Sequence, residues 1–211
     1  MSAVALWAVY VCLFAIGLLL VSERLDLVWL KWIAKPLASA SFVATAILRG
    51  ALETRYGVVI VVALVLGLVG DVLLSPKSKQ AFLAGIGAFL LGHVGFCVGF
   101  VVRGVDLGWA AAAALAVVPI GLVVGRWLMP SVPDKLRGAV VAYIVVISTM
   151  LMLAVGAAAH GATILLGAAL LFYCSDLSVA LDRFKHAGFW NRAWGLPAYF
   201  VAQLMFAWYV R

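Results

Sequence analysis

Long runs of apolar residues, separated by short polar breaks, dominate this sequence. Pro, Gly and charged residues mark the breaks, and the runs approach the roughly 20 residues that a membrane-spanning helix requires. The pattern predicts eight helical segments, at residues 3–21, 28–48, 57–74, 80–102, 107–125, 137–158, 161–181 and 193–210. The connectors are too short for a soluble domain, so we expect one all-α bundle of eight transmembrane helices over residues 1–211.

The composition supports a polytopic membrane protein. Of the residues, 67% are hydrophobic and 11% are charged, and the mean hydropathy is +1.21. No soluble domain needs that much apolar surface. The run at 3–21 lacks a basic leading region, so we expect a membrane span there and not a signal peptide. Cys12, Cys97 and Cys174 all fall inside apolar runs, where free cysteine acts as a small apolar side chain.

The basic residues predict the orientation of the bundle. The net charge of +7 would suggest a nucleic-acid partner in a soluble chain. Here the charge lies at the ends of the spans, so we expect no such partner. Of the 15 Lys and Arg residues, four lie on one face and the remaining eleven on the other. The four are Arg49, Arg55, Arg103 and Arg211. The positive-inside rule then predicts that both termini lie outside the cytoplasm. We expect a multi-pass protein of a bacterial inner membrane or its equivalent.

Four ionisable residues stand inside the apolar runs: Lys35, Asp71, His93 and Asp176. A charge at the bilayer centre costs about 2.5–3.5 kcal/mol on the insertion scale, so such residues are informative. At 1.5 Å per residue, Asp71 lies about 5 Å and Asp176 about 8 Å inside the predicted cytoplasmic edge, with Lys35 in a similar layer. His93 lies deeper, near the middle of its span.

Each of these residues also has a structural interpretation. Lys35 can extend to the interface, and His93 can make an interhelical hydrogen bond. The aspartates can form a polar cluster with Lys35. A single salt bridge uses only one of them, however, so we favour a functional role for Asp71 and Asp176.

Nearby polar residues extend the same layer. Tyr199 and Gln203, four residues apart, form a polar stripe on the last predicted helix, and Tyr173 shares a face with Asp176. The "GDV" at 70–72 and the "SDL" at 175–177 are weakly alike and suggest an old parallel duplication of four helices. The GxxxG at 95–99 predicts close helix packing.

The motifs "GLVGDVLLSP", "FLAGIGAFLLGHVGF", "LLFYCSDLSVALDRF" and "LPAYFVAQLM" resemble the YhhN-like family of eight-span membrane proteins, which includes the lysoplasmalogenases. The resemblance covers most of the chain, from the Lys-Pro pair of the second span onward. It implies that Asp71 and Asp176 are the catalytic acids. It also implies a substrate pocket lined by Lys35, His93, Tyr199 and Gln203. From its shared face with Asp176 we expect Tyr173 to line the same pocket, and from the depths above we expect the pocket on the cytoplasmic side.

The implied activity is hydrolysis of the vinyl ether of a lysophospholipid in the membrane. Protonation of the alkene gives an oxocarbenium ion, and water then adds to it. Desolvation among apolar helices favours a protonated carboxyl, which can act as the acid. A second carboxylate can stabilise the cation and activate water, as in glycosidases. Lys35 and Lys77 are candidates to bind the lipid phosphate, and His93 to orient water or serve as an alternative acid. No cofactor or metal is expected, since His160 and His186 lie at span ends, away from His93.

Two other functions are compatible with these residues. Paired acids within the membrane also suit a proton-coupled transporter of small molecules or lipids. The same residues could instead be structural in a lipid-binding or scaffold protein. A hydrolase should release aldehyde in detergent without a membrane gradient, whereas a transporter should release none. A scaffold should lose folding, not turnover, when Asp71 or Asp176 is replaced by Asn.

Overall fold

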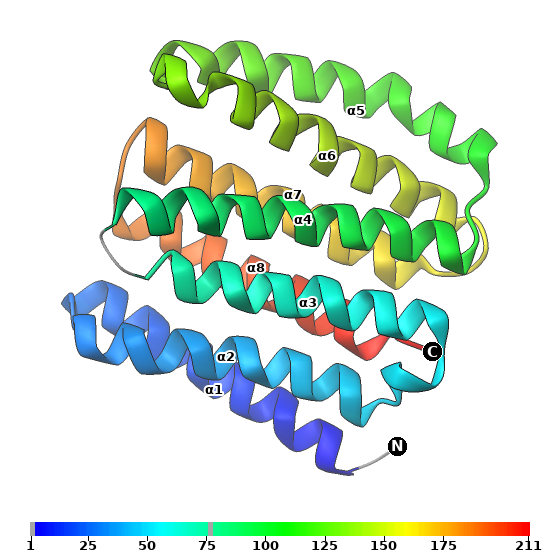
Figure 1. The fold of residues 1–211 in the computed structure, drawn as a ribbon, viewed down its shortest axis with the longest axis horizontal. Helices are drawn as coiled ribbons and strands as arrows, with labels where there is room; N and C mark the ends of the chain where they lie inside the picture. The colour runs from blue at the N-terminus through cyan, green and yellow to red at the C-terminus, as the bar shows by residue number, and fades with distance from the viewer. Residues whose placement is uncertain (1–2, 76–77) are drawn as a thin grey trace.

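The computed structural model describes residues 3–75 and 78–211, which form a bundle of helices joined by short connectors (Figure 1). Within these residues the α-helices are α1 (Ala3–Leu25), α2 (Val28–Leu48), α3 (Arg55–Leu73), α4 (Lys79–Arg103), α5 (Leu107–Leu128), α6 (Asp134–Ala158), α7 (Thr163–Phe184) and α8 (Phe189–Trp208). Two short 3-10 helices, η1 (Ala51–Glu53) and η2 (Met129–Ser131), lie between them. The predicted all-α fold of eight helices is confirmed.

Predicted and observed helix ends differ by at most four residues, and side-chain caps define the start of α3 and of α5. Helix α3 begins two residues before the apolar run, because the Thr54 hydroxyl accepts a hydrogen bond from the Gly57 N–H at 2.9 Å. Helix α5 begins where the Asp106 carboxylate accepts from the Trp109 N–H at 3.0 Å. These caps satisfy backbone donors that have no partner within the helix.

Consecutive helices pair as antiparallel hairpins except α4 and α5, since α4 packs against α6 instead. Helix α8 joins the two halves of the bundle. It packs against α7, its sequence neighbour, and also against α1, α2 and α3. Helix α5 lies at one edge of the bundle beside α6, and α1 lies at the opposite edge (Figure 1). The first and last described residues are at the same end of the bundle, as an even number of spans requires (Figure 1).

In the described part of the chain, α1, α3, α4, α5 with η2, α6 and α7 are long and apolar enough to cross a membrane, by length and composition. This makes the chain a multi-pass membrane protein. Helices α2 and α8 are less apolar: α2 carries Lys31 and Lys35, and α8 carries Arg192 and Gln203. The two more polar helices therefore bring polar side chains into the bundle. The orientation and the suggested duplication stay predictions.

Small residues let α3 and α4 approach closely, as the GxxxG at 95–99 predicts. A side chain at Gly95 would place its Cβ 2.9 Å from that of Ala63, and one at Gly99 would come 2.8 Å from Ile60 Cδ1. Aromatic rings fill the centre, where Phe96 of α4 stacks on Phe206 of α8 with centroids 4.2 Å apart. This packing supports the polar residues described below.

Candidate active site

Asp71, in the last turn of α3, is buried and fully engaged. Its Oδ2 accepts hydrogen bonds from the Ser39 hydroxyl at 2.6 Å and the Tyr199 hydroxyl at 2.8 Å. Its Oδ1 lies 3.2 Å from the Lys35 ammonium, and only 2% of the side chain is exposed. Two O–H donors and a cation are the partners that an ionised carboxylate needs when it leaves water. The surroundings of Asp71 therefore suit a carboxylate.

Gly67 on α3, which has no side chain, makes room for the α8 residues of this cluster. The Gln203 amide donates to the Tyr199 hydroxyl at 3.1 Å, so a chain of donors runs from Gln203 through Tyr199 to Asp71. A Cβ at Gly67 would lie 2.6 Å from Gln203 Nε2 and 3.1 Å from the Tyr199 hydroxyl. Gly67 is therefore required for α8 to present its polar stripe to Asp71.

Asp176, on α7, belongs to a second cluster with His93 of α4 and Tyr143 of α6. Its Oδ2 accepts from the Tyr143 hydroxyl at 3.0 Å and lies 3.1 Å from His93 Nε2. His93 is buried, with 1% exposed, whereas 17% of the Asp176 side chain is exposed. Asp176 is thus the more accessible of the two aspartates.

The ring nitrogens of His93 define where a proton can sit. The Phe89 carbonyl is 2.7 Å from Nδ1 and can only accept, so Nδ1 carries a proton. In a neutral imidazole Nε2 then has none, and it has no hydrogen bond of good geometry within the described residues despite its approach to Asp176. A proton on either Nε2 or Oδ2 would make this close pair favourable. The pair is therefore suited to hold one proton between two groups.

Aromatic rings lie between the two clusters. The Phe172 ring is 4.5 Å from the His93 ring and 5.4 Å from the Tyr199 ring, measured between centroids. Phe89, whose carbonyl accepts from His93, also packs its ring 5.7 Å from Tyr199. Both clusters thus adjoin the same apolar surface, which suits an aliphatic chain.

A cavity of about 300 Å³ reaches Lys35 from the nearby end of the bundle. It is lined by residues of α1, α2, α7 and α8 and by the end of α3: Leu19, Glu23, Val28, Lys31, Trp32, Lys35, Leu74, Ser75, Asp182, Arg192 and Leu196. The Ser75 hydroxyl donates to the Asp71 backbone carbonyl at 3.0 Å. Lys35 links the cavity to the Asp71 carboxylate, because it lines the cavity and its ammonium lies 3.2 Å from Asp71 Oδ1.

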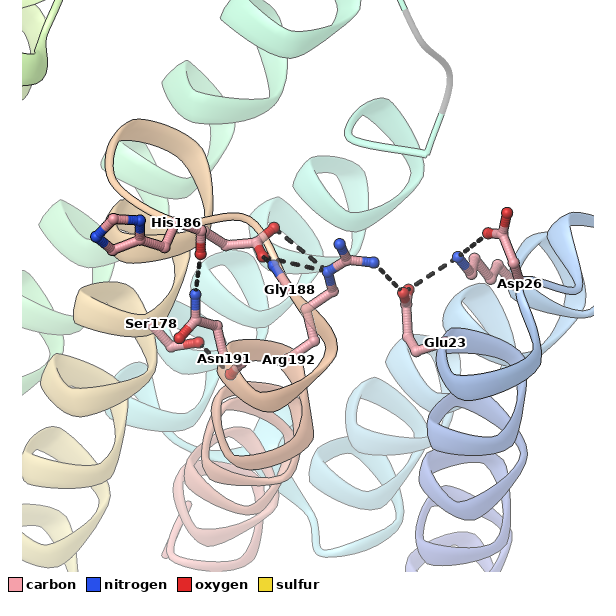
Figure 2. A network of polar contacts seen from close by, with 9 residues as sticks. Glu23, Asp26, Ser178, His186, Gly188, Asn191 and Arg192 are labelled. Carbon is pink, nitrogen blue, oxygen red and sulfur yellow. Dashed lines mark hydrogen bonds and ion pairs between the residues drawn. The ribbon is translucent and has the colours of Figure 1, made fainter.

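Figure 2 shows a network of ion pairs, several members of which line this cavity. Arg192 contacts the carboxylates of Glu23 and Asp182, and Lys31 lies 3.1 Å from Glu23. The Asp182 carboxylate also accepts from the Gly188 N–H at 2.8 Å, which fixes the turn before α8. Charged side chains from α1, α2, α7 and α8 thus meet at one end of the bundle.

The predicted site residues fall into two groups and one outlier. Lys35, Tyr199 and Gln203 lie with Asp71, and His93 lies with Asp176. Tyr173 is half-buried against the core and is not hydrogen-bonded to either aspartate in the described chain. Lys77 lies outside the described residues.

Sequence reasoning missed Ser39, Tyr143 and the ion-pair network. Ser39 follows Lys35 by four residues and so shares its helix face, which is a signal that could have found it. Tyr143 is a polar residue in the apolar run 137–158, but its partner on α7 is 33 positions away. The pairing of Arg192 with Glu23 spans 169 positions and no local pattern predicts it.

Comparison with known proteins identifies the family. No curated protein and no solved structure matched the chain. The model of the YhhN family matches residues 30–210, which include α3, α4, α7, α8 and the whole of both aspartate clusters. By this match over most of its length, and in agreement with its eight-helix fold, the chain belongs to the YhhN family.

Proposed function

We propose that this protein is a membrane hydrolase that cleaves the sn-1 alkenyl ether bond of lysoplasmalogens. The observation that carries the proposal is the different surroundings of the two aspartates. Asp71 faces two hydroxyl donors and an ammonium group, whereas Asp176 lies 3.1 Å from His93 Nε2, a contact that suits one shared proton. Vinyl-ether hydrolysis needs one group that gives a proton and one that stays negative. Membership of the YhhN family supports a lysoplasmalogenase-like activity.

The Asp176–His93 pair is assigned the first step. It transfers its proton to the β-carbon of the alkenyl group, and the carbon next to the ether oxygen becomes an oxocarbenium ion. The Asp71 carboxylate stabilises this cation. Phe89 and Phe172 supply the apolar surface for the alkenyl chain, since their rings adjoin both clusters.

The second step consumes one water. Water adds to the cationic carbon while Asp71 accepts its proton, and the product is a hemiacetal. Collapse of the hemiacetal returns its hydroxyl proton to the Asp176–His93 pair, and Asp71 protonates the departing glycerol oxygen. A fatty aldehyde and a glycerophospho-base are released, and both acid groups recover their starting states. Tyr199 and Ser39 hold Asp71 in place as hydrogen-bond donors.

The source of the new C–H bond tests this proposal. Purified protein in neutral detergent is incubated with a lysoplasmalogen in D₂O, and the aldehyde is analysed by mass spectrometry. The expected product is an aldehyde with one deuterium on the carbon next to the carbonyl. Absence of aldehyde from folded protein would contradict the hydrolase. Substrate movement across vesicles that depends on a proton gradient, without aldehyde, would instead favour the transporter.

A further inference from the structure

The cavity beside Lys35 has a charge pattern of its own. Three cations, Lys31, Lys35 and Arg192, and two carboxylates, Glu23 and Asp182, line its wall. They come from four helices and are partly buried, with between 12% and 34% of each side chain exposed. Asp71 adds a third carboxylate against Lys35. Asp26 also lies 3.2 Å from Lys31. Each cation in the described part of the cavity wall therefore already has a carboxylate partner.

Some hydrogen-bond donors of Arg192 remain available to a ligand. Arg192 directs Nη1 to Glu23 and Nε to Asp182, and Nη2 has no partner in the described part of the chain. Lys35 has one partner there, Asp71, while its side chain also lines the cavity. Donors therefore remain for a ligand with acceptor oxygens, and guanidinium groups bind phosphate particularly well.

The balance of charge decides which ligand fits. A ligand with only a phosphate would gain from Arg192 but would meet the carboxylates of Glu23 and Asp182 at short range. A ligand that carries both a phosphate and an amine can exchange partners with the existing ion pairs and leave no charge uncompensated. The cavity, about 300 Å³ in volume, can hold a small headgroup of this kind.

We propose that this cavity is a headgroup site for a zwitterionic phosphodiester lipid, in which Arg192 binds the phosphate and Glu23 binds the cationic amine. The assignment rests on the proposed function, since it takes a lysophospholipid as the ligand. It places the glycerol end of the lipid toward Lys35 and Asp71. Arg192 and Glu23 are then specificity-determining residues.

Binding can be measured without catalysis. Two ligands with a saturated alkyl ether, which has no vinyl group to hydrolyse, are titrated into the purified full chain in neutral detergent by calorimetry. One ligand is 1-O-alkyl-glycerophosphoethanolamine and the other is 1-O-alkyl-glycerophosphate. Wild type is expected to bind the ethanolamine ligand more tightly. Equal affinity, or tighter binding of the glycerophosphate, would overturn the proposal.

The variants separate the two charges of the ligand. Glu23→Gln is expected to weaken the ethanolamine ligand about tenfold, because one charge-assisted contact is lost, and to leave the glycerophosphate unchanged or tighter. Arg192→Gln is expected to weaken both. Arg137→Gln, which disrupts an exposed ion pair with Asp134, is the control and should change neither. If Glu23→Gln does not fold, Glu23→Ala takes its place. Equal effects of the carboxylate variant on both ligands would overturn the proposal.

The outcomes for the two proposals differ. Selective binding of the ethanolamine ligand, with no aldehyde from the alkenyl substrate, would remove the hydrolase and keep the headgroup site. Aldehyde release by a protein that shows no headgroup selectivity would keep the hydrolase and remove the headgroup site.

Discussion

The ion pair between Lys35 and Asp71 makes a quantitative prediction about stability. At 3.2 Å, two unit charges attract by about 5 kcal/mol at an effective dielectric constant of about 20. Much of that attraction offsets the cost of taking both groups out of water. Removal of one partner from a buried pair therefore costs about 3–5 kcal/mol, whereas removal of both costs much less.

The structure indicates which single variant suffers more. In Lys35→Met, the Asp71 carboxylate stays 2% exposed and keeps only its two hydroxyl donors. In Asp71→Asn, the Lys35 side chain, 17% exposed, can turn toward the cavity and its water. We expect a loss near the upper end of that range, about 5 kcal/mol, for Lys35→Met and about 3 kcal/mol for Asp71→Asn.

Thermal unfolding of the purified variants, all in the same detergent, measures these losses of stability. Since 1 kcal/mol corresponds to about 2–4 °C for a chain of this size, Asp71→Asn should lower the melting temperature by about 6–12 °C. The double variant should melt higher than Lys35→Met alone. The exposed pair Asp134–Arg137 serves as the control, where the same cycle should give less than about 1 kcal/mol. Additive losses in the Lys35–Asp71 double variant would refute this reasoning.

Further predictions concern packing and the second cluster. Gly67→Ala should destabilise the fold by about 1–3 kcal/mol and slow aldehyde release, because its Cβ collides with Gln203. The double variant Gly67→Ala with Gln203→Ala should recover stability but not activity. Recovery of both stability and activity would contradict a role for the hydrogen-bond chain from Gln203 to Asp71. Tyr143→Phe should lower the rate of aldehyde release about tenfold, through loss of one hydrogen bond to Asp176, with the melting temperature lowered by a few degrees at most. Tyr173→Phe, which leaves the hydrogen bonds of both clusters intact, should leave the rate of aldehyde release unchanged; a large loss of rate would favour the role in substrate binding that the sequence predicts for Tyr173.

Hydropathy, together with the positions of Pro, Gly and charged residues, was sufficient to predict the eight α-helices of the described chain. Apolar runs between Pro, Gly and charged residues predict helix ends that agree with the structure to within a few residues, because lipid leaves the backbone few alternatives to a helix. The reduced apolarity of α2 and α8 followed from residues that were visible in the sequence, such as Lys35 and Gln203. Their meaning became clear only from the helices around them.

The composition of the site was partly predictable. The cost of a charge in lipid marked Asp71 and Asp176 as unusual, and depth along each helix placed Lys35 in the layer of Asp71, which the structure confirms. Depth does not fix rotation about the helix axis or the choice of neighbouring helix. For that reason the separation of the aspartates into two clusters, and the contact of Tyr143 with Asp176, could not be derived from the sequence.

The ion-pair network could not be predicted from the sequence, for a different reason. Glu23, Lys31, Asp182 and Arg192 lie near helix ends, where charged residues are expected in any membrane protein and usually face solvent. Only the packing of α1, α2, α7 and α8 at one end of the bundle shows that these charges surround a cavity.

The central claim is that two carboxylates divide the work of one hydrolysis. The most direct measurement is fatty-aldehyde release from a lysoplasmalogen by purified wild type, Asp71→Asn and Asp176→Asn in detergent, with Asp134→Asn as the exposed control. Melting curves establish that each variant is folded. The account predicts aldehyde from wild type and the control, and none above background from either site variant. Full activity in folded Asp71→Asn or Asp176→Asn would contradict it.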